Sequence, residues 1–162
     1  MKCIYVFLTA ILLMGCVATP KLQTRKEQFL ESEFAPYAGN GTSKIIGQAF
    51  LKTKGGDVKF GAGVEVVLVP VTAYTTEQYV VGILGGRLLE KQHPAYFKYR
   101  RTRVGDGSGN FEFENMPAGE YYLSCIITWL VAGPYGLESS GGVAHAKVKV
   151  GSGESVKVIV TR

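Results

Sequence analysis

Residues 109–123 have the sequence GNFEFENMPAGEYYL, and this short segment indicates the fold class of the chain. Phe111 and Phe113 alternate with glutamates, which is typical of a β-strand with one buried and one exposed face. A turn of proline, alanine and glycine leads into a second strand, in which Tyr121 and Leu123 share a face. The segment therefore predicts two antiparallel strands joined by a tight turn.

The same alternation, interrupted by glycine-rich turns, continues on both sides of this segment. Counting the two strands above, we predict seven strands, at 45–52, 64–70, 96–104, 111–114, 121–126, 144–150 and 156–160. Seven short strands with turns between them are typical of a Greek-key β-sandwich. The sequence therefore predicts one all-β domain over residues 44–162.

Two segments do not follow the alternation of the strands. Residues 74–94 contain an apolar run around Tyr79 and are expected to form an extra hairpin or a short helix. Residues 129–142 contain Trp129, Tyr135 and several glycines and are expected to form a long loop. Because long loops on a rigid sandwich often carry binding residues, we expect specific function in these two segments.

Residues 16–43 have a different composition from the domain, with many polar residues and no sustained apolar period. This composition predicts a flexible tether. Within it, Thr24 to Glu27 has the form of a capping box and predicts a short helix through Leu30 and Glu31. A helix this short is marginal unless it docks on another element.

The N-terminus has one lysine, Lys2, and then an apolar stretch over 4–14, which suits a secretory signal and is too short to span a bilayer. The stretch ends in Leu13-Met14-Gly15-Cys16. This motif resembles the lipobox of bacterial lipoproteins, in which an aliphatic residue and a small residue precede the cysteine. An ordinary secretory signal or an uncleaved anchor is the alternative.

The lipobox resemblance implies that residues 1–15 are a signal peptide and that Cys16 carries a diacylglycerol with acyl chains such as palmitate. Several acyl chains anchor a protein far more firmly than one myristoyl chain. Val17, in place of the aspartate that tends to retain lipoproteins in the inner membrane, favours the outer membrane of a Gram-negative host. We therefore expect a lipid-anchored protein of the cell envelope.

The domain itself resembles the carboxypeptidase regulatory-like domain, a transthyretin-type (prealbumin-like) sandwich related in architecture to Ig folds. The resemblance rests on the segments 46–49, 61–70, 102–106, 109–113 and 116–123. It implies a binding or scaffolding module without catalysis of its own. It also places Tyr121 where a tyrosine-corner hydroxyl fixes the turn before it.

The composition excludes several kinds of site. Removal of residues 1–15 takes away Lys2 and lowers the net charge from +5 to +4, which suits an anionic lipid surface better than nucleic acid. It also leaves Cys125 without a disulfide partner once Cys16 is lipidated, so we expect a buried thiol. His93 and His145 lack further ligands in a metal-binding spacing, and we predict no metal, cofactor or catalytic residues.

Candidate calcium and nucleophile patterns have simpler interpretations. Asp106, Ser108 and Asn110 alternate as in a calcium loop, but the glycine and glutamate that such a loop needs are absent, so a tight turn is predicted. Ser139 and Ser140 precede His145, but no G-x-S-x-G motif surrounds them. An enzyme is therefore the least favoured function.

Basic and aromatic residues alternate between positions 91 and 103, which predicts a charged edge strand or a surface for an anionic partner. The candidate binding surface comprises Tyr79, Lys98, Tyr99, Arg100, Arg101, Arg103, Trp129 and Tyr135. Our leading hypothesis is a non-enzymatic, lipid-anchored module that contacts an envelope protein or glycan. The alternative is a subunit of a larger envelope or secretion assembly, such as type VI secretion, by analogy of fold.

Overall fold

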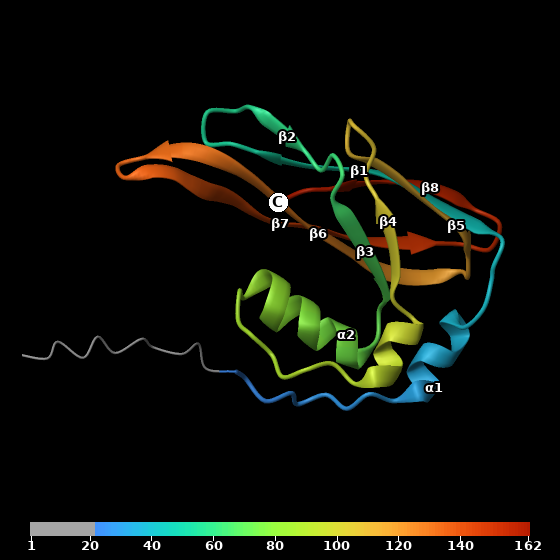
Figure 1. Ribbon diagram of the computed structural model, residues 1–162. Helices are drawn as coiled ribbons and strands as arrows, with labels where there is room; N and C mark the ends of the chain where they lie inside the picture. Colours follow the sequence, from blue (N-terminus) through green and yellow to red (C-terminus); the bar gives the residue numbers. More distant parts are fainter. Residues whose placement is uncertain (1–21) are drawn as a thin grey trace, which may run out of the picture.

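The computed structural model describes residues 22–162, in which eight strands form two sheets packed face to face (Figure 1). The first sheet contains β1 (Ser43–Lys52), β2 (Val58–Phe60), β5 (Asn110–Met116) and β8 (Ser155–Val160). The second contains β3 (Glu65–Pro70), β4 (Arg101–Val104), β6 (Gly119–Gly133) and β7 (Gly136–Val150), in the order β4-β3-β6-β7. All pairs are antiparallel except β1 with β8. The predicted β-sandwich is confirmed, and its Greek-key and transthyretin-like details stay a prediction.

The main core lies between the two sheets because each strand turns its alternate apolar residues inward. In β1 and β5 the residues that alternate with exposed or half-buried ones are almost fully buried, as the pattern around Phe111 and Phe113 predicts. The inward face of β6 continues from Tyr121 to Ile127. The buried core residues are Ile45, Ala49, Leu51, Val66, Leu68, Phe111, Phe113, Met116, Tyr121, Leu123, Cys125, Ile127, Ala144, Val150 and Val160.

Local predictions about turns and burial are also confirmed. Tyr121 Oη donates to Pro117 O at 2.7 Å, as a tyrosine corner requires. Asp106 Oδ1 accepts from the backbone amides of Ser108 and Asn110, both at 2.8 Å, which closes the tight turn before β5. Burial raises the pKa of the Cys125 thiol to about 11, so this cysteine stays protonated at neutral pH.

Three predictions about the strands are wrong. The described residues form eight strands rather than seven, since the short β2 was not predicted. The strand expected at 96–104 begins only at Arg101, because Pro94–Lys98 forms the 3₁₀ helix η3. The loop expected at 129–142 is instead the end of a long hairpin, in which β6 and β7 stay paired up to Gly133 and Gly136.

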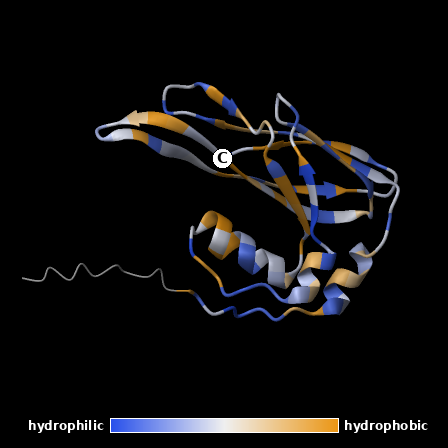
Figure 2. Cartoon of the chain, viewed as in Figure 1, coloured by the Kyte–Doolittle hydropathy of each residue, from blue (hydrophilic) through white to orange (hydrophobic). Residues whose placement is uncertain are grey.

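The hairpin end projects beyond the rest of the sandwich (Figure 1). A two-residue turn of Pro134 and Tyr135 closes it. Figure 2 shows that hydrophobic residues continue along β6 into this projecting part. Leu130, Leu137 and Tyr135 are exposed there, Tyr135 almost completely at 99%.

Residues 73–84 form a helical segment. Of the two structures predicted for residues 74–94, a hairpin or a short helix, the helix is therefore the one present. It consists of α2 (Ala73–Glu77), followed directly by η2 (Gln78–Leu84), whose turns are those of a π-helix. A capping box begins the helix. The backbone amide of Thr75 donates to the side chain of Thr72, and the backbone amide of Thr72 donates to the side chain of Thr75. Thr75 Oγ1 also donates to Pro70 O at 2.6 Å, which fixes the start of the helix at the end of β3.

The prediction of a flexible tether is wrong from Gln23 onward. Residues 22–42, here called the N-terminal strap, lie along the helical side of the domain and contain α1 (Glu31–Phe34) and the 3₁₀ helix η1 (Ala35–Tyr37) (Figure 1). The helix predicted to begin near Thr24 is also wrong, because α1 begins seven residues later. The predicted signal peptide and the lipid site at Cys16 lie outside the described residues.

A second, aromatic core holds the strap in place. It consists of Phe34, Tyr74 and Tyr96, with Phe29, Val69 and Tyr99 packed against it. Phe34 is fully buried, and its ring lies 4.6 Å from that of Phe29 in a stacked arrangement. The strap, α2 and η3 therefore form one layer on the outer face of the second sheet. Within residues 22–162, no helix has the length and apolar character needed to cross a membrane.

Candidate ligand-binding groove

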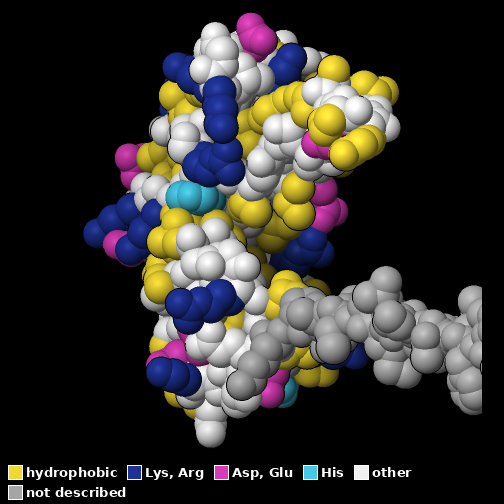
Figure 3. Space-filling model, turned by 90° about the vertical axis from the view of Figure 1, so that its left-hand side faces the viewer, with side chains coloured by type: hydrophobic (Ala, Val, Ile, Leu, Met, Phe, Trp, Pro, Cys, Tyr) yellow, Lys and Arg dark blue, Asp and Glu magenta, His cyan; other side chains and the backbone are white. Residues whose placement is uncertain are grey.

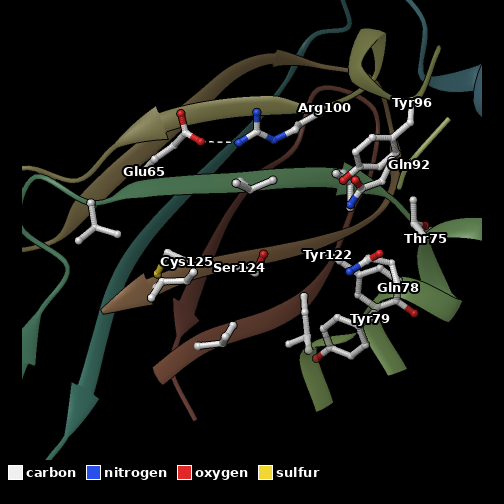
Figure 4. A pocket seen from close by; sticks show the side chains of 16 residues that line it. Glu65, Thr75, Gln78, Tyr79, Gln92, Tyr96, Arg100, Tyr122, Ser124 and Cys125 are labelled. Carbon is white, nitrogen blue, oxygen red and sulfur yellow. Dashed lines mark hydrogen bonds and ion pairs between the residues drawn. The ribbon is translucent and has the colours of Figure 1, made fainter. Parts of the chain in front are cut away.

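A groove of about 490 Å³ lies between η2 and the outer face of β3, β6 and β7 (Figure 4). We call it the helix groove. Strand residues form its floor, and η2 and the segment before η3 form its walls. Its lining residues are Val64, Glu65, Val67, Val69, Thr75, Gln78, Tyr79, Ile83, Gln92, Tyr96, Arg100, Tyr122, Ser124, Cys125, Ile126 and Val143.

Tyr79 joins η2 to the sheet below it. Its ring stacks on that of Tyr122 in β6, with the ring centres 4.1 Å apart and the planes 12° from parallel. Tyr79 Oη also forms a hydrogen bond of 2.8 Å with His145 Nδ1 in β7. Thr76 Oγ1 adds a 3.2 Å hydrogen bond to Tyr122 Oη. These contacts attach the helical segment to two strands, β6 and β7, beside the groove.

The N-terminal strap supports η2 from the opposite side. The backbone amides of Lys26 and Glu27 donate to the two carboxylate oxygens of Glu77, at 2.8 and 3.2 Å. Arg25 Nη2 donates to Gln78 Oε1 at 2.5 Å, and the Arg25 guanidinium lies 4.4 Å from the centre of the Tyr74 ring. The strap therefore orients the amide of Gln78, which lines the groove.

The polar groups of the groove fall into two kinds. At one end, Arg100 and Glu65 form an ion pair, so their charges cancel (Figure 4). Further along, the side chains of Gln92 and Ser124 form no hydrogen bond to any other described residue. The groove thus offers hydrogen-bonding groups above an aliphatic floor without a net charge, which suits a neutral polar ligand with apolar faces.

Three of the side chains that line the groove have raised pKa values. Burial raises the pKa of Tyr79, with a smaller effect from Tyr122, and burial likewise raises that of Tyr96. Both hydroxyls therefore stay protonated at neutral pH and can donate hydrogen bonds. The raised pKa of Cys125 keeps its thiol from acting as a nucleophile. Among residues 22–162, no group of three or more His, Cys, Asp or Glu side chains is placed to hold a metal ion.

The eight residues of the predicted binding surface do not form one surface. Tyr79 and Arg100 line the helix groove, whereas Lys98 is exposed on η3. Tyr99 packs beside the aromatic core, and its hydroxyl donates to Glu31 Oε1 at 3.4 Å.

The remaining four residues have separate positions. Arg101 Nη2 donates to Gly39 O at 2.6 Å, and Arg103 Nε donates to Glu112 O at 3.1 Å, so both arginines hold neighbouring segments together. The predicted edge strand is confirmed, because β4 is the last strand of its sheet. Trp129 lines a different cleft at the end of the sandwich, and Tyr135 lies at the hairpin turn.

Four residues that line the groove were not predicted as site residues: Gln78, Gln92, Tyr122 and Ser124. One signal for the groove was present in the sequence. Tyr122 is a large residue on the face of β6 opposite to the core, which indicates that another layer covers it, and Tyr122 is buried in the structure. Gln92 lies in an irregular segment and carries no comparable signal.

Comparison with known proteins shows a similarity of structure rather than membership of a known family. No protein-family model matches the chain, and no curated protein matches its sequence. Among solved structures, the chain is similar to PA1324 of Pseudomonas aeruginosa, a protein proposed to bind carbohydrate. The two share 27% sequence identity with a TM-score of 0.76, over 84% of this chain and 99% of that one. The similarity is thus to a protein proposed to bind carbohydrate, and the carboxypeptidase regulatory-like and lipoprotein assignments stay predictions.

Proposed function

We propose that this chain is a carbohydrate-binding module and that the helix groove holds the saccharide. Two observations together carry the proposal. The groove has hydrogen-bonding groups and aliphatic side chains in its lining, and the chain is similar in structure to PA1324 along nearly the whole length of PA1324. The leading sequence hypothesis named a protein or a glycan as the partner. The similarity favours the glycan.

The chemistry of the groove matches the two surfaces of a sugar ring. Sugar rings have C–H faces that pack on apolar side chains, and Val67, Ile126 and Val143 supply such a surface. Their hydroxyls need paired donors and acceptors, which the amide of Gln92 and the hydroxyl of Ser124 provide. Since Arg100 and Glu65 neutralise each other, the groove suits an uncharged saccharide.

A blocking substitution tests the proposal. Ser124→Trp fills the groove floor, and we expect the full-length chain to lose binding to neutral oligosaccharides in a glycan array and in calorimetry. Thr128→Trp is the matched control, because Thr128 lies on the same face of β6 but outside the groove lining. Equal binding by both variants would show that the saccharide does not occupy the groove.

We also propose that the module acts at the cell envelope, anchored through lipid on Cys16. The lipobox-like sequence that ends in Cys16 supports this arrangement. Cys16→Ser should move the protein from the membrane fraction to the soluble fraction of disrupted cells. Retention of that variant in the membrane fraction would refute lipid anchoring at this residue.

The second candidate function is a subunit of a larger envelope assembly. The projecting hairpin favours it, because Leu130, Tyr135 and Leu137 expose apolar surface away from the groove. A photo-crosslinking amino acid in place of Tyr135 should then join the chain to one defined envelope protein in intact cells. Crosslinks to lipid alone, or none, would exclude this function.

A further inference from the structure

A second cleft, of about 580 Å³, lies at the open end of the sandwich, on the other side of the projecting hairpin from the helix groove. It separates the connection between β1 and β2 from the paired strands β6 and β7, and we call it the end cleft. Its lining residues, Lys52, Thr53, Lys54, Gly55, Asp57, Lys59, Trp129, Leu130, Val131, Ser140, Gly141 and Arg162, include none that line the helix groove.

The end cleft is strongly basic. Lys52, Lys54, Lys59 and Arg162 line it, and Asp57 is the one acidic side chain among its lining residues. Within the described part of the chain, none of these four cations forms an ion pair, in contrast to Lys44, Arg100 and Lys147 elsewhere on the surface. Figure 3 shows lysine and arginine side chains beside a hydrophobic lobe on this end of the molecule.

Lys59 points to the inner side of the sheet. It pairs with Leu51, and residues directly opposite in antiparallel strands share a face. Leu51 is buried in the core, so Lys59 lies on the core side, where the sandwich opens. On the facing sheet, Trp129 and Val131 continue the inward face of Ile127. A cation and an aromatic side chain thus face the same space from two sheets.

Arg162 approaches the cleft across a glycine. Its Nη1 atom lies 2.7 Å from the position that a Cβ atom would occupy at Gly142, so any side chain there would displace the guanidinium. Gly142 also has φ = +155°, which L residues rarely adopt. The backbone of β7 therefore leaves room for the Arg162 guanidinium, and Arg162 lines the same cleft as the three lysines.

We propose that the end cleft binds an acidic saccharide, with carboxylate or phosphate groups held by Lys52, Lys54, Lys59 and Arg162 and a sugar ring against Trp129. The choice of a saccharide rests on the proposed function, whereas the preference for an anion rests on the cleft alone. Unpaired cations around one hollow attract anions, and a neighbouring indole supplies a flat apolar surface. The protein would then bind a neutral unit in the helix groove and an acidic unit in the end cleft.

The test compares two ligands and two double variants of the full-length chain. Calorimetry measures binding of a short oligomannuronate and of a neutral mannan oligosaccharide of the same length. We expect Lys54→Gln with Lys59→Gln to weaken oligomannuronate binding about tenfold or more, because charge-assisted hydrogen bonds are lost. The control, Lys149→Gln with Lys157→Gln, removes two exposed lysines outside the cleft and should leave binding unchanged.

Two further measurements keep the outcomes distinct. Rising salt should weaken the binding of oligomannuronate to the unaltered chain but not the binding of the neutral oligosaccharide. This measurement needs no variant. Ser124→Trp should abolish neutral binding and retain acidic binding, so failure of the helix groove is separable from failure of the end cleft. No binding of oligomannuronate, equal effects of both double variants on its affinity, or binding only to vesicles of anionic phospholipid would each overturn the proposal.

Discussion

Replacement of Phe34 by alanine tests whether the N-terminal strap is part of the folded domain. Phe34 is fully buried in the aromatic core, between the strap and the helical layer. A buried phenylalanine removes about 150 Å² of apolar surface from water, and at about 25 cal/mol per Å² this amounts to about 4 kcal/mol. The value agrees with the range of about 3–5 kcal/mol found for such truncations. We therefore expect Phe34→Ala to lower the free energy of unfolding by about 4 kcal/mol.

Urea denaturation monitored by circular dichroism gives this free energy from the midpoint and slope of the transition. Leu30→Ala is the matched control, because Leu30 lies in the same strap but is 50% exposed, and we expect a loss below about 0.5 kcal/mol. Since α2 rests on the same aromatic core, Phe34→Ala should also weaken saccharide binding in the helix groove. A Phe34→Ala protein as stable as the Leu30→Ala protein would refute the docked strap.

Three further predictions concern single groups of the sandwich. Tyr121→Phe removes the hydroxyl that donates to Pro117 O and should lower the free energy of unfolding by about 1 kcal/mol, measured by urea denaturation; an unchanged midpoint would contradict the tyrosine corner. The Cys125 thiol, with its pKa raised to about 11, should react with a maleimide only after denaturation, and fast labelling of the native protein would show that it is accessible. Hydrogen bonds from the Asn110 side chain and from backbone amides lower the pKa of Asp106 below its usual 3.8. The ionised Asp106 therefore stabilises the folded state at neutral pH, and this stabilisation is lost as the pH falls below about 4 through the lower folded-state pKa. Asp106→Asn should therefore reduce the acid dependence of the melting temperature, and an unaltered dependence would contradict the assignment.

Most strands could be predicted because one face of each strand packs on the other sheet. The alternation in residues 109–123 therefore appears directly in the sequence as β5 and the start of β6. β2 has three residues and follows a glycine-rich turn, so it is too short to show a period. The projecting hairpin was predicted as a loop because its residues are exposed on both faces and lack an alternation of burial.

The helical layer was harder to predict because its burial depends on contacts between distant segments. Tyr96 suggested a strand, but it packs into the aromatic core from a 3₁₀ turn. Phe29 and Phe34 lie five residues apart, which matches neither the helical nor the strand period, and their partners Tyr74 and Tyr99 are far along the chain. No local pattern in the strap predicts these partners, and the polar composition of the strap resembles that of a linker.

The candidate sites were only partly predictable for the same reason. Tyr79 stood out within an apolar run, and it does line the helix groove. The lysines of the end cleft come from β1, β2 and their connection, while Trp129 and Arg162 come from elsewhere in the chain. These residues come together because the two sheets separate at one end of the sandwich. The spacing of residues in the sequence does not predict that separation.

The hydrogen bonds between the strap and Glu77 have a mechanical consequence. Because the amides of Lys26 and Glu27 attach directly to the helix that walls the groove, a pulling force applied ahead of Gln23 reaches that helix before it reaches the sandwich. Stretching the chain at that end would peel the strap away and release the wall, whereas the same force on the C-terminal strand would load the sheets. We therefore expect the proposed saccharide binding to weaken when the protein is pulled from the N-terminal side and to persist when it is pulled from the C-terminal strand.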